Sequence, residues 1–535
     1  MDCYHCNSKN IEYKFPIHTF SIYQCRDCEL AFLFPQPSEE ELSHIHANHH
    51  NSEDPSENER LQKQEVKSET IQLYLQELKA YTHQSDLRLL EIGIEDGDFL
   101  QATKEMGFQV NGIEANPAVV NSVNKKLGDS YVIQGTLDTI DFKKLGQFDV
   151  CVLLNVIDHV RDPYHFIMQI RKLLKDEGIL FTATPSLDSW SAKLLKSRWM
   201  EFKAEHLFYF NTQNLESFLV KSGFTNINTS PSFKVVNFPY MHQYLQQYPI
   251  PFLSVLSKVP GWMFPSALQQ KRFKFVASGI HTICKKRDMP AKVPKLSIIM
   301  PVYNERESFV ETMEQVLNKH LEHVEKELII VESNSTDGTK EEVAKYENHP
   351  GVTVIYEDQP QGKGHAVRNG LAHATGEILL IQDADQEYDV NDYDALLVPI
   401  LNYQKMFVLG SRHTGDWKMR SFEDHQLMGF LLNSAHILFT WMINVACGAK
   451  LKDPFTMYKV FRKECLYGLE FEANRFDFDW EIVIKFLRKN YFPLEIPVNY
   501  SSRSFSEGKK VRLFHDPMLW MIALLKFRFK KLKKA

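Results

Sequence analysis

Two acidic segments of the chain contain the residue types that hold charged or hydroxyl-rich ligands. One reads LLEIGIEDGDFL at residues 89–100, and the other reads ILLIQDADQEYD at residues 378–389. In the second segment Asp383 and Asp385 follow an apolar run that predicts a buried strand. Two carboxylates at a strand end can hold Mg²⁺ or Mn²⁺ against a diphosphate. Taken alone, an Asp-x-Asp pair is also common in solvated loops, so the prediction depends on the segments around it.

The first segment has glycines where a backbone must come close to a ligand. Gly93 and Gly97 allow a tight turn after the strand LRLLEIG, and the helix that follows presents its N-terminus there. The next predicted strand, FQVNGIE, ends in Glu114, which can accept hydrogen bonds from the two hydroxyls of a ribose. A dinucleotide site is the rival interpretation, but the glycines lack the Gly-x-Gly-x-x-Gly spacing. We therefore expect a nucleoside ligand here.

Four of the eight cysteines lie near the N-terminus as two Cys-x-x-Cys pairs. Four thiolates can surround Zn²⁺ tetrahedrally, and because they fill its coordination sphere they leave no position for a substrate. A structural zinc ribbon is predicted, with redox-active or unrelated cysteines as the alternatives. The zinc ligands would be Cys3, Cys6, Cys25 and Cys28. The other cysteines lie in apolar surroundings and are expected to be buried: Cys151, Cys284, Cys447 and Cys465.

The length of 535 residues exceeds what one hydrophobic core organises, so two large domains and a small module are expected. Strand-like and helix-like segments alternate from residue 87 and again from residue 296, which is typical of parallel sheets covered by helices. The predicted fold class is α/β, with two Rossmann-like parallel-sheet domains after a small zinc ribbon. The predicted boundaries are 1–48 for the zinc ribbon, 49–68 for a linker, 69–286 for the first domain, 287–295 for a second linker, 296–515 for the second domain and 516–535 for a basic tail.

Composition and the chain ends narrow the expected surroundings. A formal net charge of -6 gives no reason to expect nucleic acid as a partner. The N-terminus MDCYHC lacks the features of a signal peptide, and a cytoplasmic protein is expected. The most apolar segment, residues 428–447, contains Asn433, His436 and Asn444. Because such side chains are costly in lipid, we predict a helix of the second domain there.

Three later motifs of the first half resemble Rossmann-like S-adenosylmethionine-dependent methyltransferases: FDVCVLLNVIDHV, LLKDEGILFTATPS and EHLFYFNTQNLESFLVKSGF. The resemblance covers residues 69–286, and the cysteine module followed by FLFPQPSEEEL resembles the leader of some members that modify sugars. The resemblance implies S-adenosylmethionine as cofactor. Its methionine part would be lined by Glu91, Gly93 and Gly97, its ribose by Glu114, its adenine by Thr136 and its sulfonium side by Asn155.

Two positions depart from that family pattern. Glu95 stands where the family has a middle glycine, and Thr136 stands where an acid is usual. Both departures are expected to weaken cofactor binding. A base would help a sugar hydroxyl to accept the methyl group, and neutral His159 or His206 could serve. A structural role is the alternative for each histidine.

Four ordered motifs of the second half resemble glycosyltransferase family 2, which has the GT-A fold: PVYNERES, VESNSTDGT, QPQGKGHAVRNG and QDADQEYD. The resemblance covers residues 295–515 and implies Mg²⁺ or Mn²⁺ on Asp383 and Asp385. The family often has two aspartates where Glu332 and Ser333 stand, so recognition of the nucleotide base is expected to differ. By this resemblance the nucleotide-sugar donor would be bordered by Pro301, Tyr303, Glu305, Glu332, Ser333, Lys363 and Arg368.

Three carboxylates are candidates for the base that takes the acceptor's proton in an inverting transfer. Asp453 in LKDPFTMYKVFR resembles a position of polyprenyl-phosphate sugar synthases. Asp479 and Glu481 in FDFDWEIVIK resemble the acidic motif of other members. The sequence does not choose among them. An acceptor that is already a phosphate would need no base, and the carboxylate would then organise the metal or the donor.

Two basic segments offer contacts to anions. Arg503, Lys509 and Lys510 are suited to phosphate, with a solvated loop as the alternative. The tail from Lys526 to Lys534 mixes basic residues with phenylalanines. Such a mixture can bind an anionic membrane peripherally at its inner face, and a solvated helix end is the equal alternative.

These patterns together predict a bifunctional enzyme of glycan biosynthesis, such as that of a cell-envelope polysaccharide. The C-terminal half would transfer a sugar from a nucleotide sugar to a glycan or polyprenyl-phosphate acceptor. The N-terminal half would methylate a sugar hydroxyl. The alternative is a polyprenyl-phosphate sugar synthase whose methyltransferase-like half binds without catalysis.

Overall fold

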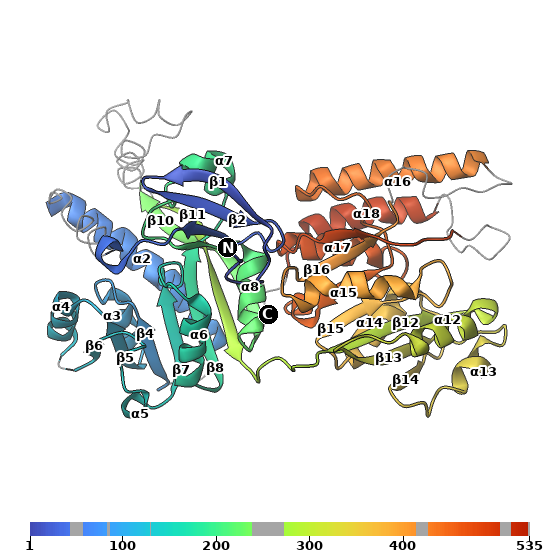
Figure 1. Cartoon of the computed structure of the whole chain (residues 1–535), viewed down its shortest axis with the longest axis horizontal. Coiled ribbons are helices and arrows are strands. Elements are labelled where there is room, and N and C mark those ends of the chain that lie inside the picture. Colours follow the sequence, from blue (N-terminus) through green and yellow to red (C-terminus); the bar gives the residue numbers. More distant parts are fainter. Residues whose placement is uncertain are drawn as a thin grey trace. The chain divides into compact units, whose positions relative to one another are not determined.

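The computed structural model describes residues 1–42, 57–82, 86–128, 130–237, 272–413, 426–502 and 515–532. The chain forms two compact units, Met1–Met289 and Pro290–Ala535, coloured blue to light green and yellow-green to red in Figure 1. Each unit is built on a seven-stranded sheet with helices packed against it, and the first also carries a four-stranded sheet. The predicted α/β class is confirmed for both units.

The cysteine module forms an antiparallel sheet with the order β1-β2-β3-β9. Its strands are β1 (Ile11–Ile17), β2 (Phe20–Cys25), β3 (Ala31–Phe34) and β9 (Phe208–Tyr209). Strand β9 comes from much later in the chain and pairs with β3, so that Phe32 lies opposite Phe208. Both phenylalanines are buried. The short module therefore completes its sheet and its small core with a strand from the rest of the unit.

The large sheet of the first unit has the order β10-β11-β8-β7-β4-β5-β6. Five of its strands are parallel: β4 (Arg88–Ile92), β5 (Gln109–Glu114), β6 (Val132–Gln134), β7 (Phe148–Leu154) and β8 (Leu174–Pro185). An antiparallel pair completes the edge: β10 (Phe224–Asn237) and β11 (Arg272–Lys286). The closing strand predicted at residues 277–286 is confirmed by β11. Strands β4 and β7 are largely buried on both faces because helices cover the sheet.

The helices of the first unit connect these strands. They are α2 (Glu57–Tyr81), α3 (Asp98–Glu105), α4 (Pro117–Leu127), α5 (Phe142–Leu145), α6 (Pro163–Leu173), α7 (Trp190–Leu195), the 3₁₀ turn η1 (Lys196–Arg198) and α8 (Thr212–Lys221). Asn116 and Asp162 cap α4 and α6, each accepting a backbone amide at 2.9 Å, and a proline follows each cap. This order of residues sets where both helices begin.

The sheet of the second unit has the order β14-β13-β12-β15-β17-β16-β18. Its strands are β12 (Lys295–Val302), β13 (Glu325–Glu332), β14 (Val352–Tyr356), β15 (Ile378–Ile381), β16 (Phe407–Ser411), β17 (Lys459–Arg462) and β18 (Leu494–Pro497). Strands β12 to β15 are mutually parallel, whereas β17 is antiparallel to both of its neighbours. Because β17 runs the other way, its first residue, Lys459, lies at the edge where β15 ends.

The helices of the second unit are α12 (Arg306–Asn318), α13 (Thr339–Ala344), α14 (Lys363–His373), η3 (Val390–Asp392), α15 (Tyr393–Leu401), α16 (Gln426–Cys447), η4 (Lys463–Leu466), α17 (Phe478–Arg488) and α18 (His515–Phe529). The helix predicted at residues 428–447 is α16. Within the described ranges, no helix combines the length and the apolarity needed to cross a membrane.

The cysteines outside the N-terminal module follow the prediction with one exception. Cys151, Cys284 and Cys465 are buried. Cys447 is only partly buried, because it lies in the last turn of α16, where Val445 is also exposed.

Candidate functional sites

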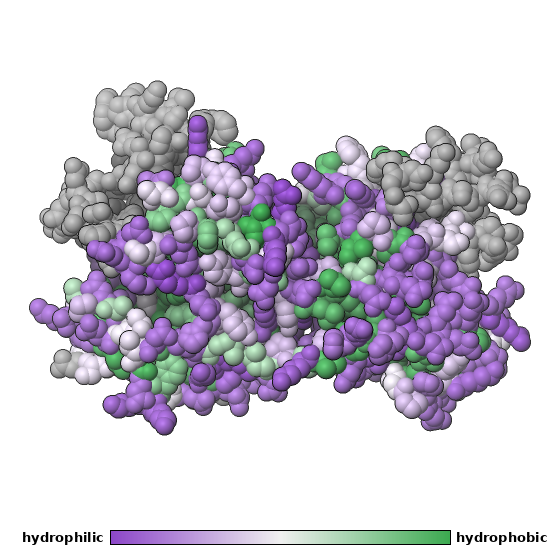
Figure 2. Space-filling model, viewed as in Figure 1, coloured by the Kyte–Doolittle hydropathy of each residue, from purple (hydrophilic) through white to green (hydrophobic). Residues whose placement is uncertain are grey.

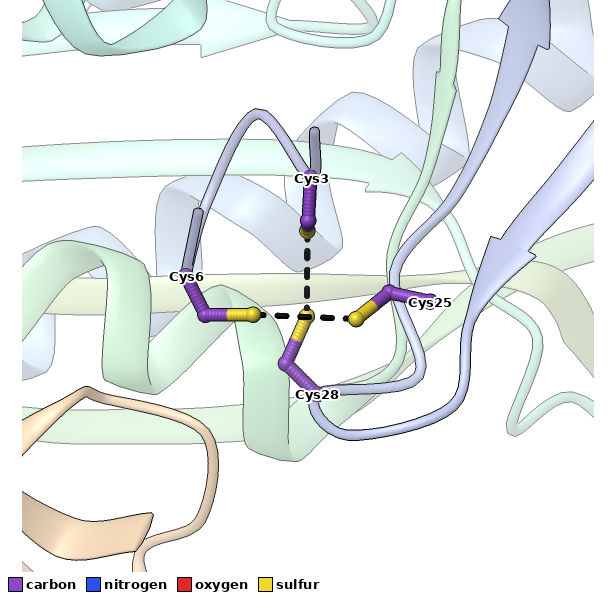
Figure 3. Close-up of side chains that lie close together, drawn as sticks. All are labelled: Cys3, Cys6, Cys25 and Cys28. Carbon is purple, nitrogen blue, oxygen red and sulfur yellow. Dashed lines mark hydrogen bonds between the residues drawn. The ribbon is translucent and has the colours of Figure 1, made fainter. Parts of the chain in front are cut away.

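The four N-terminal cysteines converge on one point, as Figure 3 shows. The Sγ atoms of Cys3 and Cys28 are 3.4 Å apart, and those of Cys6 and Cys25 are 3.6 Å apart. All four side chains are buried. The residue after each pair donates its amide to the carbonyl of the first cysteine of that pair, which closes a tight turn. This tetrathiolate set suits Zn²⁺ and would leave no coordination position open.

The turn after β4 requires glycine at two positions. Gly93 and Gly97 both have a φ of 75°, a left-handed conformation that other residues disfavour. A Cβ at Gly93 would lie 2.6 Å from Cγ2 of Val156, and one at Gly97 would lie 2.5 Å from Cγ1 of Val123. A larger residue at either position would therefore displace its neighbours.

Two glutamates beside this turn differ in the hydrogen bonds that their carboxyl oxygens accept. Oε2 of Glu114, at the end of β5, accepts the amide of Ile94 at 2.8 Å, and its Oε1 accepts the amide of Asn116 at 2.8 Å. A carboxylate oxygen has a second lone pair, so each can still accept a ribose hydroxyl. Glu91 in β4 is buried, and its Oε2 has no hydrogen-bond partner among the described residues. Burial raises the pKa of Glu91 to about 8, a state that a nearby cation would relieve.

Glu95, the departure from the family glycine, points to solvent. Its side chain is 84% exposed, and its Oε2 lies 2.9 Å from Nζ of Lys67 on α2. Lys67 also pairs with Asp96. Glu95 is not among the residues with positive φ, so its backbone needs no glycine. The carboxylate is therefore turned towards α2, where Lys67 balances its charge.

The remaining predicted cofactor residues follow the next strand ends. Thr136 lies just beyond β6, and its amide donates to Oγ1 of Thr139 at 2.9 Å. Asn155 directly follows β7, and its amide donates to the carbonyl of Ala183 at 2.8 Å. Strands β7, β4, β5 and β6 are neighbours in the sheet, so these positions and the glycine turn share one edge. In open parallel sheets, ligands bind at this edge.

The two predicted bases of the first unit lie beside a carboxylate that sequence interpretation missed. Asp158 is fully buried, and its Oδ2 lies 3.6 Å from Nε2 of both His159 and His206. The two imidazole rings are 4.8 Å apart between centroids. Burial raises the pKa of Asp158 and lowers that of His206. The available signal was the adjacency of Asp158 to His159 in NVIDHV.

In the second unit, Asp383 and Asp385 follow β15 on a backbone held by α12. Ser308 and Thr312 donate their hydroxyls to backbone carbonyls of this motif at 3.1 and 3.2 Å. Oδ2 of Asp383 accepts from Nζ of Lys363 at 2.6 Å. Burial raises the pKa of Asp383 to about 6. The two carboxylates are thus fixed at the sheet edge, and Asp383 is paired with a partly buried cation.

A groove with a volume of about 970 Å³ begins directly after this motif. It is lined by Gln386, Glu387 and Tyr388, by the end of α12 and by Tyr500. The phenol of Tyr500 donates to Oε2 of Glu387 at 3.1 Å. The groove adjoins the motif in the sequence, but neither Asp383 nor Asp385 is among its lining residues.

Glu332, the last residue of β13, and Ser333, the residue after it, make different contacts. Glu332 is fully buried, and its two oxygens accept the amides of residues 334–335 at 3.0 and 2.7 Å, so it shapes its own loop. Ser333 donates to Oε2 of Glu357 at 2.8 Å. Nδ1 of His365 lies 2.6 Å from the other oxygen of that carboxylate. Sequence interpretation missed Glu357 and His365, because Glu357 follows an unremarkable edge strand.

The other residues predicted to bind the nucleotide-sugar donor lie in two places. Some lie at the sheet edge, and Arg368 contacts a loop. Pro301 in β12, with Tyr303 and Glu305 just after it, lies at the same edge as Asp383, and Tyr303 is 37% exposed. Arg368 on α14 instead donates Nη1 to the carbonyl of Phe471 at 3.0 Å. The structure thus gives Arg368 a contact with the loop before α17.

Two of the three predicted bases are occupied by structural contacts. Asp453 is fully buried and accepts Nε and Nη2 of Arg412 at 2.8 and 2.7 Å. Burial alone would raise the pKa of Asp453, but the charge and hydrogen bonds of Arg412 hold it well below its usual range. Glu481 is fully buried and accepts the amides of residues 472–473 at 2.8 to 3.0 Å and Nζ of Lys485 at 2.5 Å. Sequence interpretation missed Arg412, although it stands in the motif GSR.

Asp479 is the predicted base whose charge reaches the metal motif. Its Oδ1 accepts from Nζ of Lys459 at 2.7 Å, and Lys459 is fully buried at the start of β17. Burial is the largest cause of the raised pKa of Asp383, the charge of Lys363 opposes it, and the charges of Asp385 and Asp479 raise the pKa further. These side chains therefore form one charged cluster at the end of β15.

Two family models match the chain, one in each unit. Residues 297–468 match the family described as Glycosyl transferase family 2, and residues 61–229 match the family described as Methyltransferase domain. The chain therefore carries a family 2 glycosyltransferase domain and a methyltransferase domain, and both are transferase domains.

Curated relatives match the second unit. A dolichol-phosphate mannosyltransferase of Pyrococcus furiosus is 27% identical over 40% of this chain and 59% of its own length. A dolichyl-phosphate beta-glucosyltransferase of Trichomonas vaginalis is 28% identical over 44% of this chain and 77% of its own length. An undecaprenyl-phosphate 4-deoxy-4-formamido-L-arabinose transferase of Sodalis glossinidius is 24% identical over 41% of this chain and 64% of its own length. The chain thus spans less than two thirds of the length of two of these relatives.

Two solved structures are similar to parts of the chain. Glucosyl-3-phosphoglycerate synthase of Mycobacterium tuberculosis is 17% identical, with a TM-score of 0.33 over 44% of this chain and 79% of that chain. The YcgJ protein of Bacillus subtilis is 14% identical, with a TM-score of 0.30 over 41% of this chain and 99% of that chain.

Proposed function

We propose that the second unit transfers a sugar from a nucleotide-sugar donor to a polyprenyl-phosphate acceptor. We propose further that the first unit transfers a methyl group from S-adenosylmethionine to a sugar hydroxyl, so that one chain serves two steps of glycan assembly. The proposal for the second unit is carried by the state of its three candidate bases.

Asp453, Asp479 and Glu481 are each paired with a buried cation, at 2.7, 2.7 and 2.5 Å. A carboxylate oxygen that already accepts a hydrogen bond from a buried cation is poorly placed to take a proton from a hydroxyl acceptor. A phosphate monoester is already ionised near neutral pH and needs no such base. The pairing therefore supports a phosphate acceptor, the class that the names of the relatives contain.

The donor would bind at the carboxyl ends of β12, β13 and β15. Asp383 and Asp385 would hold Mg²⁺ or Mn²⁺, which neutralises charge on the departing diphosphate. Lys363, now paired with Asp383, would then be released to contact a phosphate oxygen. Pro301, Tyr303, Glu305, Glu332 and Ser333 would border the nucleoside.

Exposed apolar side chains on α16 and α18, two helices that pack together, support contact with a membrane that holds the acceptor. On α16, Trp441 and Val445 are 60% and 65% exposed, and on α18, Leu525 and Phe529 are 58% and 74% exposed. Figure 2 shows hydrophobic residues among hydrophilic ones elsewhere on this face, so what distinguishes α16 and α18 is that several large apolar side chains are exposed on two helices that pack together. The last turn of α18 adds Lys526 and Arg528, which suit anionic lipid headgroups. Vesicle flotation tests this contact: wild type should float with anionic vesicles, and W441S with F529S should not.

The first unit would bind S-adenosylmethionine along one sheet edge. The cofactor is a cation, and Glu91 is a buried carboxyl with an unsatisfied oxygen beside the turn of Gly93 and Gly97. Glu114 would bind the ribose, and Thr136 and Asn155 would face the adenine and the sulfonium. The acceptor oxygen would be activated at the group formed by Asp158, His159 and His206. Predicted contacts at Arg503, Lys509 and Lys510 lie outside the described residues.

Product mass spectrometry tests both proposals in one experiment. The full chain is given Mn²⁺, a panel of nucleotide sugars, isotope-labelled S-adenosylmethionine, and either polyprenyl phosphate or free glycans. A sugar on polyprenyl phosphate is expected, and transfer only to free glycans would overturn the acceptor class. Cofactor binding without label in any product would mean that the first unit binds without catalysis.

A further inference from the structure

Three ligating side chains of the first unit meet just beyond the carboxyl ends of its parallel strands. Asp158 and His159 lie in the turn after β7, and His206 lies just before β9. The backbone carbonyl of Asp158 accepts the amide of Leu207 at 2.7 Å, which holds the two segments together. Among the described residues, the cysteine centre is the other place where three or more such ligand atoms lie within 4.8 Å of one another.

The distances within this group match ligands around an ion. Nε2 of His159 and Nε2 of His206 each lie 3.6 Å from the same oxygen, Oδ2 of Asp158. This distance is too long for a hydrogen bond. Zn²⁺ with bonds of about 2.0–2.1 Å separates neighbouring tetrahedral ligand atoms by about 3.4 Å. Small side-chain rotations would therefore bring all three atoms into the shell of one ion.

The hydrogen bonds of Asp158 and His206 go to the outer atoms of these two side chains. Oδ1 of Asp158 accepts from Oγ1 of Thr184 at 3.1 Å, whereas Oδ2 has no hydrogen bond among the described residues. Nδ1 of His206 lies 2.7 Å from the carbonyl oxygen of Glu201. A carbonyl only accepts, so Nδ1 donates this hydrogen bond, and Nε2 is the nitrogen that faces Oδ2. Metal-bound histidines commonly donate their other ring N–H to a backbone carbonyl in this way.

The group also lies beside the predicted cofactor turn and is open on one side. Val156, three residues before His159, is the side chain that contacts Gly93. The side chain of His159 is 27% exposed, whereas those of Asp158 and His206 are buried. Three protein ligands on one side of an ion leave positions for water or for an oxygen of a substrate.

The geometry points to a metal site formed by Asp158, His159 and His206, which binds a divalent transition-metal ion of the Zn²⁺, Co²⁺ or Fe²⁺ type. Two imidazoles and one carboxylate favour such ions over Mg²⁺ and Ca²⁺, which take oxygen ligands. The ion would bind the acceptor oxygen in place of a free histidine base. That use depends on the proposed methyl transfer, but metal binding does not.

Equilibrium dialysis of the full chain against Co²⁺ tests the site. The D385N background removes binding at the glycosyltransferase motif. A thiolate charge-transfer band identifies any Co²⁺ that enters the cysteine centre, and that amount is subtracted. The D385N chain with no change in its first unit should then bind about one further Co²⁺ ion per chain. Chains that also carry D158N or H159Q should lose that ion. Equal retention in all three proteins would overturn the metal site.

A surface histidine supplies the matched control. Nε2 of His165 lies 3.4 Å from Oδ1 of Asp138, both side chains being more than half exposed, so H165Q removes a histidine near a carboxylate without touching the group. H165Q should bind as much Co²⁺ as wild type, and a loss there would also overturn the assignment. H159Q changes a partly exposed side chain, so it keeps the test valid if D158N does not fold. Calorimetry with S-adenosylmethionine and no added metal reports cofactor binding separately, so the two proposals can fail independently.

Discussion

In each unit the candidate site lies at the carboxyl ends of the parallel strands of its own sheet. The units differ in whether their buried carboxyl groups are paired with a cation. In the second unit, Asp453 and Asp479 are paired with Arg412 and Lys459. In the first unit, Glu91 and Asp158 are buried, and each has one oxygen without a hydrogen bond among the described residues. Burying a carboxylate without such a partner costs free energy.

This difference shows what each unit lacks before it binds its ligands. The second unit supplies its own cations, so its charged groups are held in place before substrate arrives. In the first unit, Glu91 and Asp158 are buried carboxyls with raised pKa values, and each has an oxygen that accepts no hydrogen bond among the described residues, which fits the proposed cationic cofactor and metal ion. Substitutions at Arg412, Glu91, Asp385 and Glu95 test this difference.

Loss of Arg412 should destabilise the second unit most. The change R412A leaves Asp453 as a buried carboxylate without its cation, which costs about 3–5 kcal/mol in free energy of unfolding. Denaturant unfolding followed by fluorescence measures it. R306A is the control, because Arg306 makes its contacts at an exposed position. A loss below about 1 kcal/mol for R412A would show that the pair does not organise the fold.

Glu91 should make the stability of the first unit depend on pH. Its pKa is raised to about 8 in the folded chain, whereas it is near 4.5 when exposed. Between those values the unfolded chain has released the proton and the folded chain keeps it. The free energy of unfolding therefore falls as pH rises through this window, by about 5 kcal/mol at most, and is level above it.

Comparison with E91Q isolates that contribution. The neutral amide cannot ionise, so the Tm of E91Q should exceed that of wild type increasingly from pH 5 to pH 8. Scanning calorimetry of both full chains across this range measures the difference. Parallel Tm curves would mean that Glu91 is ionised in the folded chain.

Loss of one metal-motif carboxylate should abolish most sugar transfer without unfolding the chain. D385N removes a metal ligand, and a loss of several kcal/mol in stabilisation of the diphosphate corresponds to at least about 100-fold in rate. D358N, at an exposed carboxylate in the same unit, is the control and should transfer normally. Transfer by D385N within about tenfold of wild type would remove the metal role from this residue.

Restoring the family glycine at Glu95 should change little. The carboxylate is exposed and paired with Lys67, and surface pairs contribute about 0–1 kcal/mol. E95G should therefore lower Tm slightly, because glycine adds backbone freedom to the unfolded chain. Calorimetry should find S-adenosylmethionine affinity unchanged within about threefold, a difference below about 1 kcal/mol. A tenfold gain would show that Glu95 obstructs the cofactor.

Local patterns in the sequence were sufficient for the parts of the sites that lie on one strand end or one turn. Asp383 and Asp385 follow an apolar run, and the cysteine pairs carry their spacing with them. The closing strand β11 and helix α16 were likewise readable, because alternation and apolar content are properties of short segments.

Partners distant in the sequence were not readable. Asp158 was passed over beside His159, because only the fold brings His206 to it. Asp453 looked like a base, because the sequence does not reveal that Arg412 neutralises it. The degree of burial was not readable from the sequence either, since the raised pKa of Glu91 comes from the packing around β4.

The sequence by itself determined the fold class of both units, the two transferase families and the ligand types at the cysteine and aspartate motifs. These depend on residue type and short spacing, which the chain carries before it folds. The tertiary structure alone decided which carboxylates are neutralised, which remain unsatisfied, and that Asp158, His159 and His206 form one group. Electrostatic energies depend on distance in space and on burial, and neither is defined until the strands are packed side by side.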